Sequence, residues 1–319
     1  MLVGALLPIV VALGLGFLAG ARHDFSAPQA AILNRMVMEY ALPLSLFAGV
    51  IAVPRGRLFS NLPMLAWIAG GMVGSLAVVY VISRFAARRP APVAALQALA
   101  IASPAVPFVG TSVLPDLFHA EAGLAVSIGS LMVNLVQAPF VMLVLTRAAN
   151  GGPDQAPAKV GKQASAAAQL ARDLRQTVME PVVWAPLAAF VLVACGIGLP
   201  KILHGSLMLL GQATGGVALF ASGATLFAQK VSVSKAVWLN VVSRNLAIPA
   251  AVWGLMVLAG AGAQPTALVV TTLAIPSGSI ATILAIRFGV AAREVASTLF
   301  ISTVGSALTM GLFLWLTHA

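Results

Sequence analysis

Cysteine, histidine and acidic residues are scarce in this chain of 319 residues. It contains one cysteine, Cys195, four histidines, and eight aspartates and glutamates in total. A single cysteine excludes a disulfide within the chain, and since Cys195 lies in an apolar run we expect it to be packed inside. The histidines fall at loops or ends, which excludes a histidine metal cluster. Neither a phosphate-binding GxxxxGK[ST] pattern nor HExxH occurs, so we expect no ATP-driven pump, no zinc protease, no enzyme and no cofactor.

Charge of either sign is also rare. Charged residues make up 8% of the chain, against about 25% in soluble domains, while 60% of the residues are hydrophobic. The mean hydropathy is +1.01. These values exclude a soluble protein and indicate that the lipid bilayer is the solvent. The net charge of +10 would indicate nucleic acid in a soluble protein, but here the basic residues sit in short loops, so we expect no nucleic-acid partner.

Long apolar runs occur throughout the chain. A bilayer-spanning helix needs roughly 20 mostly apolar residues, and ten segments meet this length. The first of them is interpreted as a transmembrane helix rather than a signal peptide, because the chain never turns soluble after it. The expected segments are residues 2–20, 33–53, 62–84, 92–113, 120–147, 178–198, 204–228, 235–259, 265–287 and 293–316.

A polar stretch divides these segments into two sets of five. Residues 148–176 contain a Gly- and Pro-rich run followed by Lys159, Lys162, Arg172 and Arg175, which is typical of a flexible linker leading into a basic surface helix. We therefore expect a first five-helix repeat over 1–147, a cytoplasmic basic linker over 148–176 and a second five-helix repeat over 177–319.

Basic residues predict the orientation. With the N-terminus outside, three loop residues fall outside, namely Arg55, Arg57 and Lys201. The cytoplasmic side then holds Arg22, Arg35, Arg84, Arg88, Arg89, Arg147, Lys159, Lys162, Arg172, Arg175, Lys230, Lys235, Arg287 and Arg293. This bias predicts both termini outside and the linker inside a bacterial inner membrane.

Five helices are an odd number, so the second half must enter the membrane from the opposite face. If both halves share a fold, they form an inverted repeat. Residues 46–50 (LFAGV) echo residues 219–223 (LFASG) in corresponding segments. The fold class expected is therefore an all-α integral membrane protein of ten transmembrane helices in two inverted five-helix repeats.

The fourth and ninth segments are both interrupted. Pro104 and Pro107 break residues 98–111, while Pro276 and Gly278 break residues 268–281. Proline removes a helix hydrogen bond, and exposed backbone is tolerated in a membrane only against protein or water. Interrupted helices at matching places in two halves predict a transporter's binding site. Simple proline kinks are the alternative.

Small polar residues surround the two breaks. Hydroxyls and unwound backbone offer donors to an anion, aided by the positive N-terminal ends of the half-helices; close helix packing is the alternative role. Neither broken segment contains an acidic residue, which favours anionic over cationic cargo. The candidate substrate-binding residues near the breaks are Ser103, Pro104, Pro107, Thr111, Pro276, Ser277, Gly278 and Ser279.

Arg244, Glu39 and Asn134 are the other candidates. Arg244 lies several residues inside the eighth segment, where it either attracts an anionic substrate, locks a conformation, or snorkels to the surface. Glu39 either pairs with Arg35 one turn earlier or faces the interior and meets a cation or proton. Asn134, which we include in the substrate site, and Gln137 lie deep in the fifth segment, where interhelical hydrogen bonding is the alternative.

Two stretches resemble the auxin efflux carrier family, whose bacterial members include malonate-transporter-like proteins. Residues 32–47 (ILNRMVMEYALPLSLF) are similar to the family's second helix, and Phe108-Val-Gly110 with Leu114 matches the end of its fourth-helix motif. The resemblance covers nearly the whole chain. Many members carry an asparagine where this chain has about Ala105, which joins the candidate site as a departure from the pattern.

The resemblance implies a scaffold domain from the first, second, sixth and seventh segments and a transport domain from the others. The fourth and ninth segments would cross at the substrate, and movement of one domain against the other would give elevator-type alternating access. It also implies a homodimer and small organic anions, carboxylates such as malonate, as substrates, with proton or sodium coupling left open. The alternatives are a sodium-coupled symporter of the bile-acid type, a cation or proton exchanger, and an intramembrane enzyme or sensor.

Overall fold

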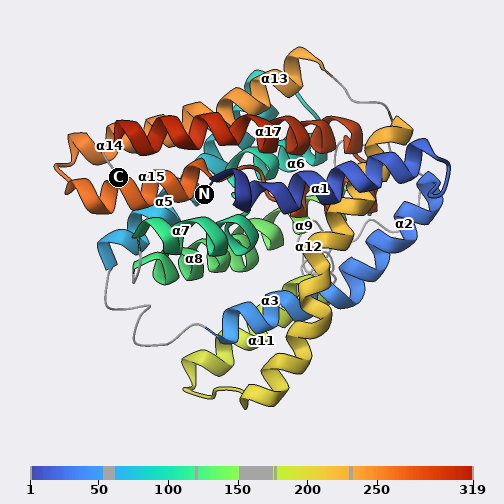
Figure 1. Ribbon diagram of the computed structural model, residues 1–319, viewed down its shortest axis with the longest axis horizontal. Helices are drawn as coiled ribbons and strands as arrows, with labels where there is room; N and C mark the ends of the chain where they lie inside the picture. Colours follow the sequence, from blue (N-terminus) through green and yellow to red (C-terminus); the bar gives the residue numbers. More distant parts are fainter. Residues whose placement is uncertain are drawn as a thin grey trace, which may run out of the picture.

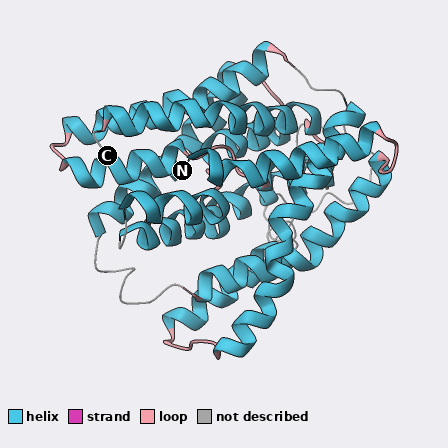
Figure 2. Ribbon diagram, in the orientation of Figure 1, coloured by secondary structure: helices cyan, strands magenta, loops and turns pink. Residues whose placement is uncertain are grey.

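The structure, a computed structural model, describes residues 2–52, 62–118, 121–150, 175, 178–229 and 233–317. All regular elements in these ranges are helical (Figure 2). The expected linker over 148–176 lies largely outside the described residues, as do Arg55 and Arg57, so the prediction of a basic surface helix there is untested.

The first half of the chain forms helices that cover the first five expected segments. Several runs are continued by a π-helical turn (η), in which the chain is wound more loosely than in an α-helix. In order they are α1 (Leu2–Ala21), α2 (Ala27–Met36), η1 (Val37–Ala41), α3 (Leu42–Ile51), α5 (Leu62–Val81), η2 (Ile82–Ala86), α6 (Ala91–Ala102), η3 (Val106–Gly110), α7 (Thr111–Phe118), α8 (Ala122–Leu131), η5 (Met132–Gln137) and α9 (Ala138–Ala149).

The second half covers the remaining five segments in the same way. Its elements are α11 (Pro181–Ala194), α12 (Lys201–Gln229), α13 (Lys235–Val242), η6 (Ser243–Ala247), α14 (Ile248–Leu258), α15 (Ala263–Ala274), α16 (Ile280–Phe288) and α17 (Ala292–Leu316). The all-helical class is thus confirmed for the described residues, while the inverted-repeat arrangement stays a prediction.

Length and apolar composition identify membrane spans among the described helices. Four qualify, over Pro63–Ala86, Ala122–Ala149, Ile202–Ala221 and Lys235–Leu258. A fifth is present if Ala292–Ser306 and Leu308–Leu316, which meet at a 50° bend, form one span. Large apolar side chains such as Leu209, Leu258 and Leu308 are exposed on the outer faces, as expected where lipid is the neighbour. The chain is therefore a multi-pass membrane protein.

The helices pack in two groups. In one, α1 lies along α12, and α3 packs against both α11 and α12. In the other, α5 to α9 pack with α13 to α17. Figure 1 shows α3 and α11, with the adjoining end of α12, at the lower edge of the molecule, where α3 also packs against α8 and α11 against η5.

Glycines bring α1 and α12 unusually close. A Cβ added at Gly16 would lie 2.0 Å from the carbonyl oxygen of Phe220, and one added at Gly223 would lie 2.1 Å from that of Leu13. Neither position has room for a side chain. Small residues that let backbones approach are the usual way to join helices in lipid, where no hydrophobic force drives association.

The two broken segments form the centre of the core. Residues 94–106 and 266–285 are the long unbroken runs of buried residues in the described chain. Both lie between helices on every side, so their irregular backbone has no contact with lipid, as the membrane requires.

The prediction that Cys195 is packed inside is wrong. Cys195 is exposed, because α11 ends at Ala194 and the chain then turns at Gly196, whose φ is +76°. The sequence pattern placed the end of the apolar run, at residue 198, four residues beyond the end of the helix.

Candidate functional site

The two breaks meet and pair with each other. The crossing consists of residues 103–105, between α6 and η3, and residues 275–279, between α15 and α16. The amide of Ala105 donates to the carbonyl of Pro276 at 2.9 Å, and the amide of Gly278 donates to the carbonyl of Ser103 at 2.8 Å. These two bonds form an antiparallel bridge between Pro104 and Ser277, so the two segments run in opposite directions here.

Proline explains why these carbonyls are free to pair. In a continuous helix the carbonyl of residue i accepts from the amide of residue i+4. Pro104 has no amide proton for Ala100, and Pro107 has none for Ser103. The second break supplies both missing donors. The Ser277 hydroxyl donates to the carbonyl of Ala100 at 2.7 Å, and Gly278 supplies Ser103 as described.

The carbonyls of Ile101 and Ala102, between Ala100 and Ser103, accept hydrogen bonds from side chains of other helices. Arg244 Nη1 donates to the carbonyl of Ile101 at 3.2 Å, and Gln137 Nε2 donates to that of Ala102 at 3.1 Å. Every carbonyl from residue 100 to 103 therefore has a partner outside α6. Backbone groups buried in this way are costly when left unpaired, so the crossing is held together by these five hydrogen bonds.

Glycine at position 278 permits this close approach. A Cβ there would lie 3.3 Å from the carbonyl oxygen of Ser103 and 3.5 Å from its Oγ. The first distance is tighter than usual for a methyl group and the second is an ordinary contact, so a residue larger than alanine would push the two breaks apart.

Arg244 lies beneath the crossing, completely buried. It sits in η6, inside the helical run from Lys235 to Leu258, and its Nη2 donates to the carbonyl of Ile275 in addition to the bond with Ile101. The interpretation that its side chain snorkels to the surface is therefore wrong. The guanidinium instead bridges the ends of α6 and α15.

Asn245 supports the second break from the same turn. Its Nδ2 donates to the carbonyl of Ser302 at 2.9 Å, and its Oδ1 accepts from the Ser302 hydroxyl at 2.6 Å. The Ser302 oxygen accepts from the amide of Ser277 at 3.2 Å. Two residues of η6 thus hold the crossing. Arg244 does so through the carbonyls of Ile101 and Ile275, and Asn245 does so through Ser302 of α17.

A cavity of about 60 Å³ lies against the crossing. One wall comes from α3 and α12, and the other from the crossing, the α8–η5 run and the start of α16. The lining residues are Leu42, Ser45, Leu46, Gly49, Ser103, Pro104, Ala105, Ser130, Val133, Asn134, Thr214, Gly278, Ser279, Ile280 and Ile283. The cavity therefore lies between the two groups of helices.

Three buried polar atoms of the lining have no hydrogen-bond partner among the described residues. They are Ser103 Oγ, Asn134 Oδ1 and Thr214 Oγ1, and the three side chains are between 0 and 3% exposed. Buried polar atoms are nearly always satisfied in native proteins. Three unsatisfied atoms from three elements around one cavity are what a site built for a polar ligand presents.

The cavity brings together six of the residues that the sequence indicated. Ser103, Pro104, Ala105, Gly278, Ser279 and Asn134 line it. Pro276 and Ser277 are engaged in holding the crossing. Arg244 does not contribute to the lining of this cavity. Pro107 and Thr111 lie in η3 and α7, and their side chains lie outside what the structure describes.

Two further predictions concern single polar residues. Glu39 pairs with Arg35, Nε to Oε1, at 2.8 Å on an exposed face, which confirms the pairing rather than an inward-facing carboxylate. Gln137 bonds to carbonyls on two other helices, Met72 at 2.9 Å and Ala102, which confirms interhelical bonding there. The carboxamide oxygens of both residues, Gln137 Oε1 and Asn134 Oδ1, have no hydrogen-bond partner among the described residues, and only that of Asn134 belongs to a residue that lines the cavity.

Sequence reasoning missed Ser45, Ser130 and Thr214 as parts of the lining. Each is a lone small hydroxyl in an apolar run, and such residues are common at helix contacts in membranes. The available signal was weak: Ser45 follows Pro43 in the stretch that carries the family resemblance, and Thr214 lies five residues before the LFASG echo.

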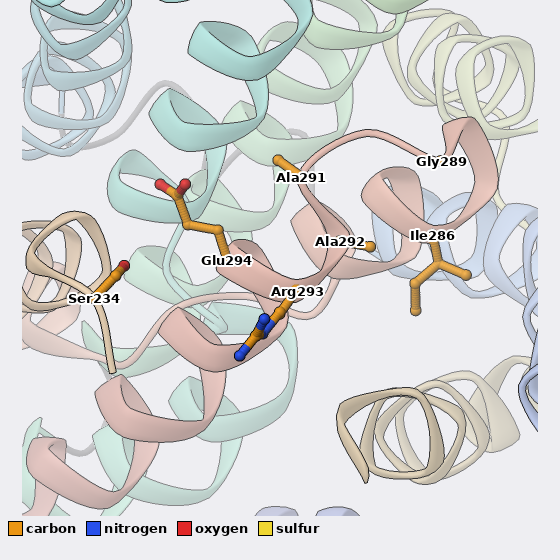
Figure 3. Close-up of a pocket in the computed structure, with 7 residues that line it drawn as sticks. All are labelled: Ser234, Ile286, Gly289, Ala291, Ala292, Arg293 and Glu294. Atoms are coloured by element: carbon orange, nitrogen blue, oxygen red, sulfur yellow. The ribbon is translucent and has the colours of Figure 1, made fainter. Parts of the chain in front are cut away.

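A second, larger hollow of about 440 Å³ lies away from the crossing, at the ends of α13, α16 and α17. Figure 3 shows Arg293 and Glu294 leaving the first turn of α17 in different directions beside it. The Glu294 carboxylate is already engaged, by Arg89 at 2.8 Å and by Asn240 Nδ2 at 3.2 Å. Both charge signs are present, so this hollow has no preference for an anion.

Comparison with known proteins places the chain in a family. The model of a family described as membrane transport protein matches residues 1–314. The uncharacterized transporter YfdV of Escherichia coli (strain K12) is 31% identical over 322 residues, covering 99% of this chain and 98% of the relative. The YfdV proteins of Escherichia coli O157:H7 and Shigella flexneri match to the same extent. The chain thus belongs to the membrane transport protein family, that of the auxin efflux carriers.

Proposed function

We propose that this protein is a secondary transporter of small organic anions, carboxylates such as malonate, with the substrate held at the crossing. The observation that carries the proposal is the cavity with three unsatisfied polar atoms beside two paired helix breaks. A site of this kind, made of unwound backbone between half-helices, is typical of secondary transporters.

The character of the cavity favours an anion. The lining residues include hydroxyls and a carboxamide but no acidic side chain. Ser279 and Ile280 line it at the start of α16, where the first amide groups of a helix lack partners within the helix and carry partial positive charge. A carboxylate placed there would accept hydrogen bonds from these amides and from the Ser103 and Thr214 hydroxyls.

Asn134 offers a polar contact where Ala105 provides none. Both residues line the cavity, one from η5 and one from the crossing. Where many family members carry an asparagine near position 105, this chain would present its carboxamide from the fifth segment instead.

The size of the cavity supports alternating access. About 60 Å³ holds a few water molecules, whereas ligand pockets usually measure about 300–1,000 Å³. A dicarboxylate would therefore enter only when the walls separate. Since the walls belong to different groups of helices, we propose an elevator-type movement of α5–α9 and α13–α17, as a transport domain, against a scaffold of α1–α3, α11 and α12.

We also propose a membrane orientation, an oligomeric state and a choice of coupling ions. Both termini lie outside a bacterial inner membrane and the linker lies inside, as the basic residues predict. The scaffold provides the surface of a homodimer. Coupling is to protons or sodium, or to neither.

Reconstitution into proteoliposomes tests the proposal. Radiolabelled malonate uptake should be saturable, and it should be lost in Pro107→Leu and Pro276→Leu. Gly14→Ala, at a position with open space around it, is the control that should keep full uptake. Retained uptake in both proline variants would remove the crossing as the site. Uptake that requires sodium would favour the bile-acid type of symporter, and pH-driven cation flux without malonate would favour an exchanger.

A further inference from the structure

We infer that Arg244 is a built-in cation that positions the crossing, occupying the place where a coupling cation would bind, so that transport requires no sodium. The inference deepens the proposed function and rests on it where it concerns transport. Its structural half, that a fixed guanidinium replaces a bound cation, stands on the contacts of Arg244 alone.

The guanidinium of Arg244 lies between the C-terminal ends of α6 and α15. Ile101 lies in the last turn of α6, and Ile275 is the residue that follows the last turn of α15. The carbonyl ends of helices carry partial negative charge. Arg244 donates to the carbonyls of both residues from two different nitrogens, so one positive group serves two converging negative ends.

The carbonyls of Ile101 and Ile275 receive no hydrogen bond from an amide of their own helices. The amide of Ala105, which would serve Ile101 in a continuous helix, donates instead to Pro276. Ile275 has an extended conformation, with ψ of 137°, and lies outside any helix. Without Arg244, two buried carbonyl oxygens at the crossing would lack their donor.

The positive charge of Arg244 needs compensation inside the protein. Arg244 is completely buried and has no carboxylate partner among the described residues. A buried cation is strongly disfavoured unless it is paired and hydrogen-bonded. Here the only counter-charge on the described residues is the pair of oriented carbonyl ends. The residue and the two breaks therefore stabilise one another.

Arg244 does not contact the cavity in the state observed, so it does not bind substrate directly there. The crossing separates Arg244 from the cavity, whose lining does not include it. Nη1 and Nη2 both donate to backbone carbonyls, while the buried Nε has no hydrogen-bond partner among the described residues. Arg244 is thus a positioning residue that acts through the breaks.

The position of Arg244 bears on whether transport is coupled to sodium. In transporters with broken helices, unwound carbonyls and the C-terminal ends of half-helices are the groups that coordinate sodium. In this chain two such carbonyls already receive hydrogen bonds from a guanidinium, and its fixed charge would repel a second cation. The site that sodium would use is filled by the protein itself.

The test uses purified full-length protein in detergent and needs no substrate. The melting temperature of the wild type should be the same in sodium chloride and in choline chloride. In Arg244→Gln it should fall by about 5 °C or more, and guanidinium or sodium ions should restore part of the loss. Arg287→Gln removes an arginine from an ion pair with Glu180 and is the matched control, expected to show no such rescue.

Transport supplies the second readout. Wild-type uptake should be unchanged when sodium is replaced by choline, and Arg244→Lys, which keeps the charge but offers a single donor group, should retain part of it. Sodium-dependent uptake, sodium-dependent stabilisation of the wild type, or an Arg244→Gln protein that is as stable as the wild type would overturn the inference. If Arg244→Gln does not fold, the sodium responses of the wild type and of Arg244→Lys decide.

The two proposals fail in different ways. Loss of all carboxylate uptake by the wild type would contradict the proposed function, yet the melting experiments would still support or contradict the role of Arg244. Normal malonate uptake with strict sodium dependence would keep the function and overturn the inference.

Discussion

Glu180 and Arg287 join the start of α11 to the end of α16 across the boundary between the two groups of helices. One guanidinium nitrogen of Arg287 contacts both carboxylate oxygens of Glu180, at 2.9 and 2.8 Å. The pair is partly exposed, with 31% of the Arg287 side chain and 18% of the Glu180 side chain accessible. A contact of this kind is worth about 1 kcal/mol or less, weak enough to open in each transport cycle.

We predict that fixing this pair stops transport. With Cys195→Ser as background, Glu180→Cys and Arg287→Cys together should react with a short bis-methanethiosulfonate, which forms a disulfide with each thiol, and lose malonate uptake; a reducing agent should cleave the disulfides and restore it. The physical reason is that the proposed movement separates α11 from α16. Each single cysteine variant serves as the control. Full uptake after complete cross-linking would contradict a movement at this boundary.

Substitution of Asn134 should affect uptake, whereas substitution of Gln137 should affect stability. Asn134 Oδ1 is buried without a partner among the described residues, so Asn134→Ala should leave the melting temperature nearly unchanged. It should raise the KM for uptake about 10-fold, because the Nδ2 of the carboxamide would donate to the substrate carboxylate, and a lost hydrogen bond to a charged ligand is worth about 1.5 kcal/mol or more. Gln137→Ala removes the donor to Ala102 and should lower stability by about 1–3 kcal/mol.

Thermal unfolding and uptake kinetics on the same preparations check both variants. The pair is informative because the residues lie one turn apart in η5. An Asn134→Ala protein that unfolds early while keeping its KM would show that the residue is structural.

Ser277 offers a test of the paired breaks themselves. Ser277→Ala leaves the carbonyl of Ala100 without the donor that Pro104 denies it, and we expect a loss of about 1–3 kcal/mol in unfolding free energy. Ser127→Ala is the control, because that hydroxyl donates to the carbonyl of Gly123 within its own helix, at an exposed position. Equal melting temperatures for the two variants would mean that the bond from Ser277 contributes little.

The contact of α1 with α12 makes a fourth prediction. Gly16→Ala should destabilise the protein by about 1–3 kcal/mol, typical of overpacking, because the new methyl would meet the carbonyl of Phe220. Gly14→Ala, two residues earlier, meets nothing within 4 Å and should be neutral or slightly stabilising. Circular dichroism melts of the two proteins in detergent measure the difference.

The helical segments and the positions of both breaks could be predicted from the sequence. Hydropathy marks apolar runs, and Pro104, Pro107 and Pro276 mark where amide donors are missing, because both signals are local. The end of α11 was misplaced at Cys195 because the turn at Gly196 interrupts a run that is still apolar beyond it.

The partners of the breaks could not be predicted. Ser277 and Ala100 are 177 residues apart, and no local pattern states that one supplies the donor that the other lacks. Arg244 was recognised as important from its place in an apolar segment, but snorkelling and burial give the same sequence pattern. Thr214 was missed because only the packing of α12 against the crossing turns it toward the cavity.

The donors that satisfy residues 100–103 also set the order in which the protein can be assembled. Of the four carbonyls, three depend on groups from the second half of the chain, Arg244, Ser277 and Gly278. During synthesis the first half would enter the bilayer with these oxygens unsatisfied until about 175 further residues have been made. We expect the first half alone to be degraded in the membrane, and co-expression of the two halves as separate chains to rescue both.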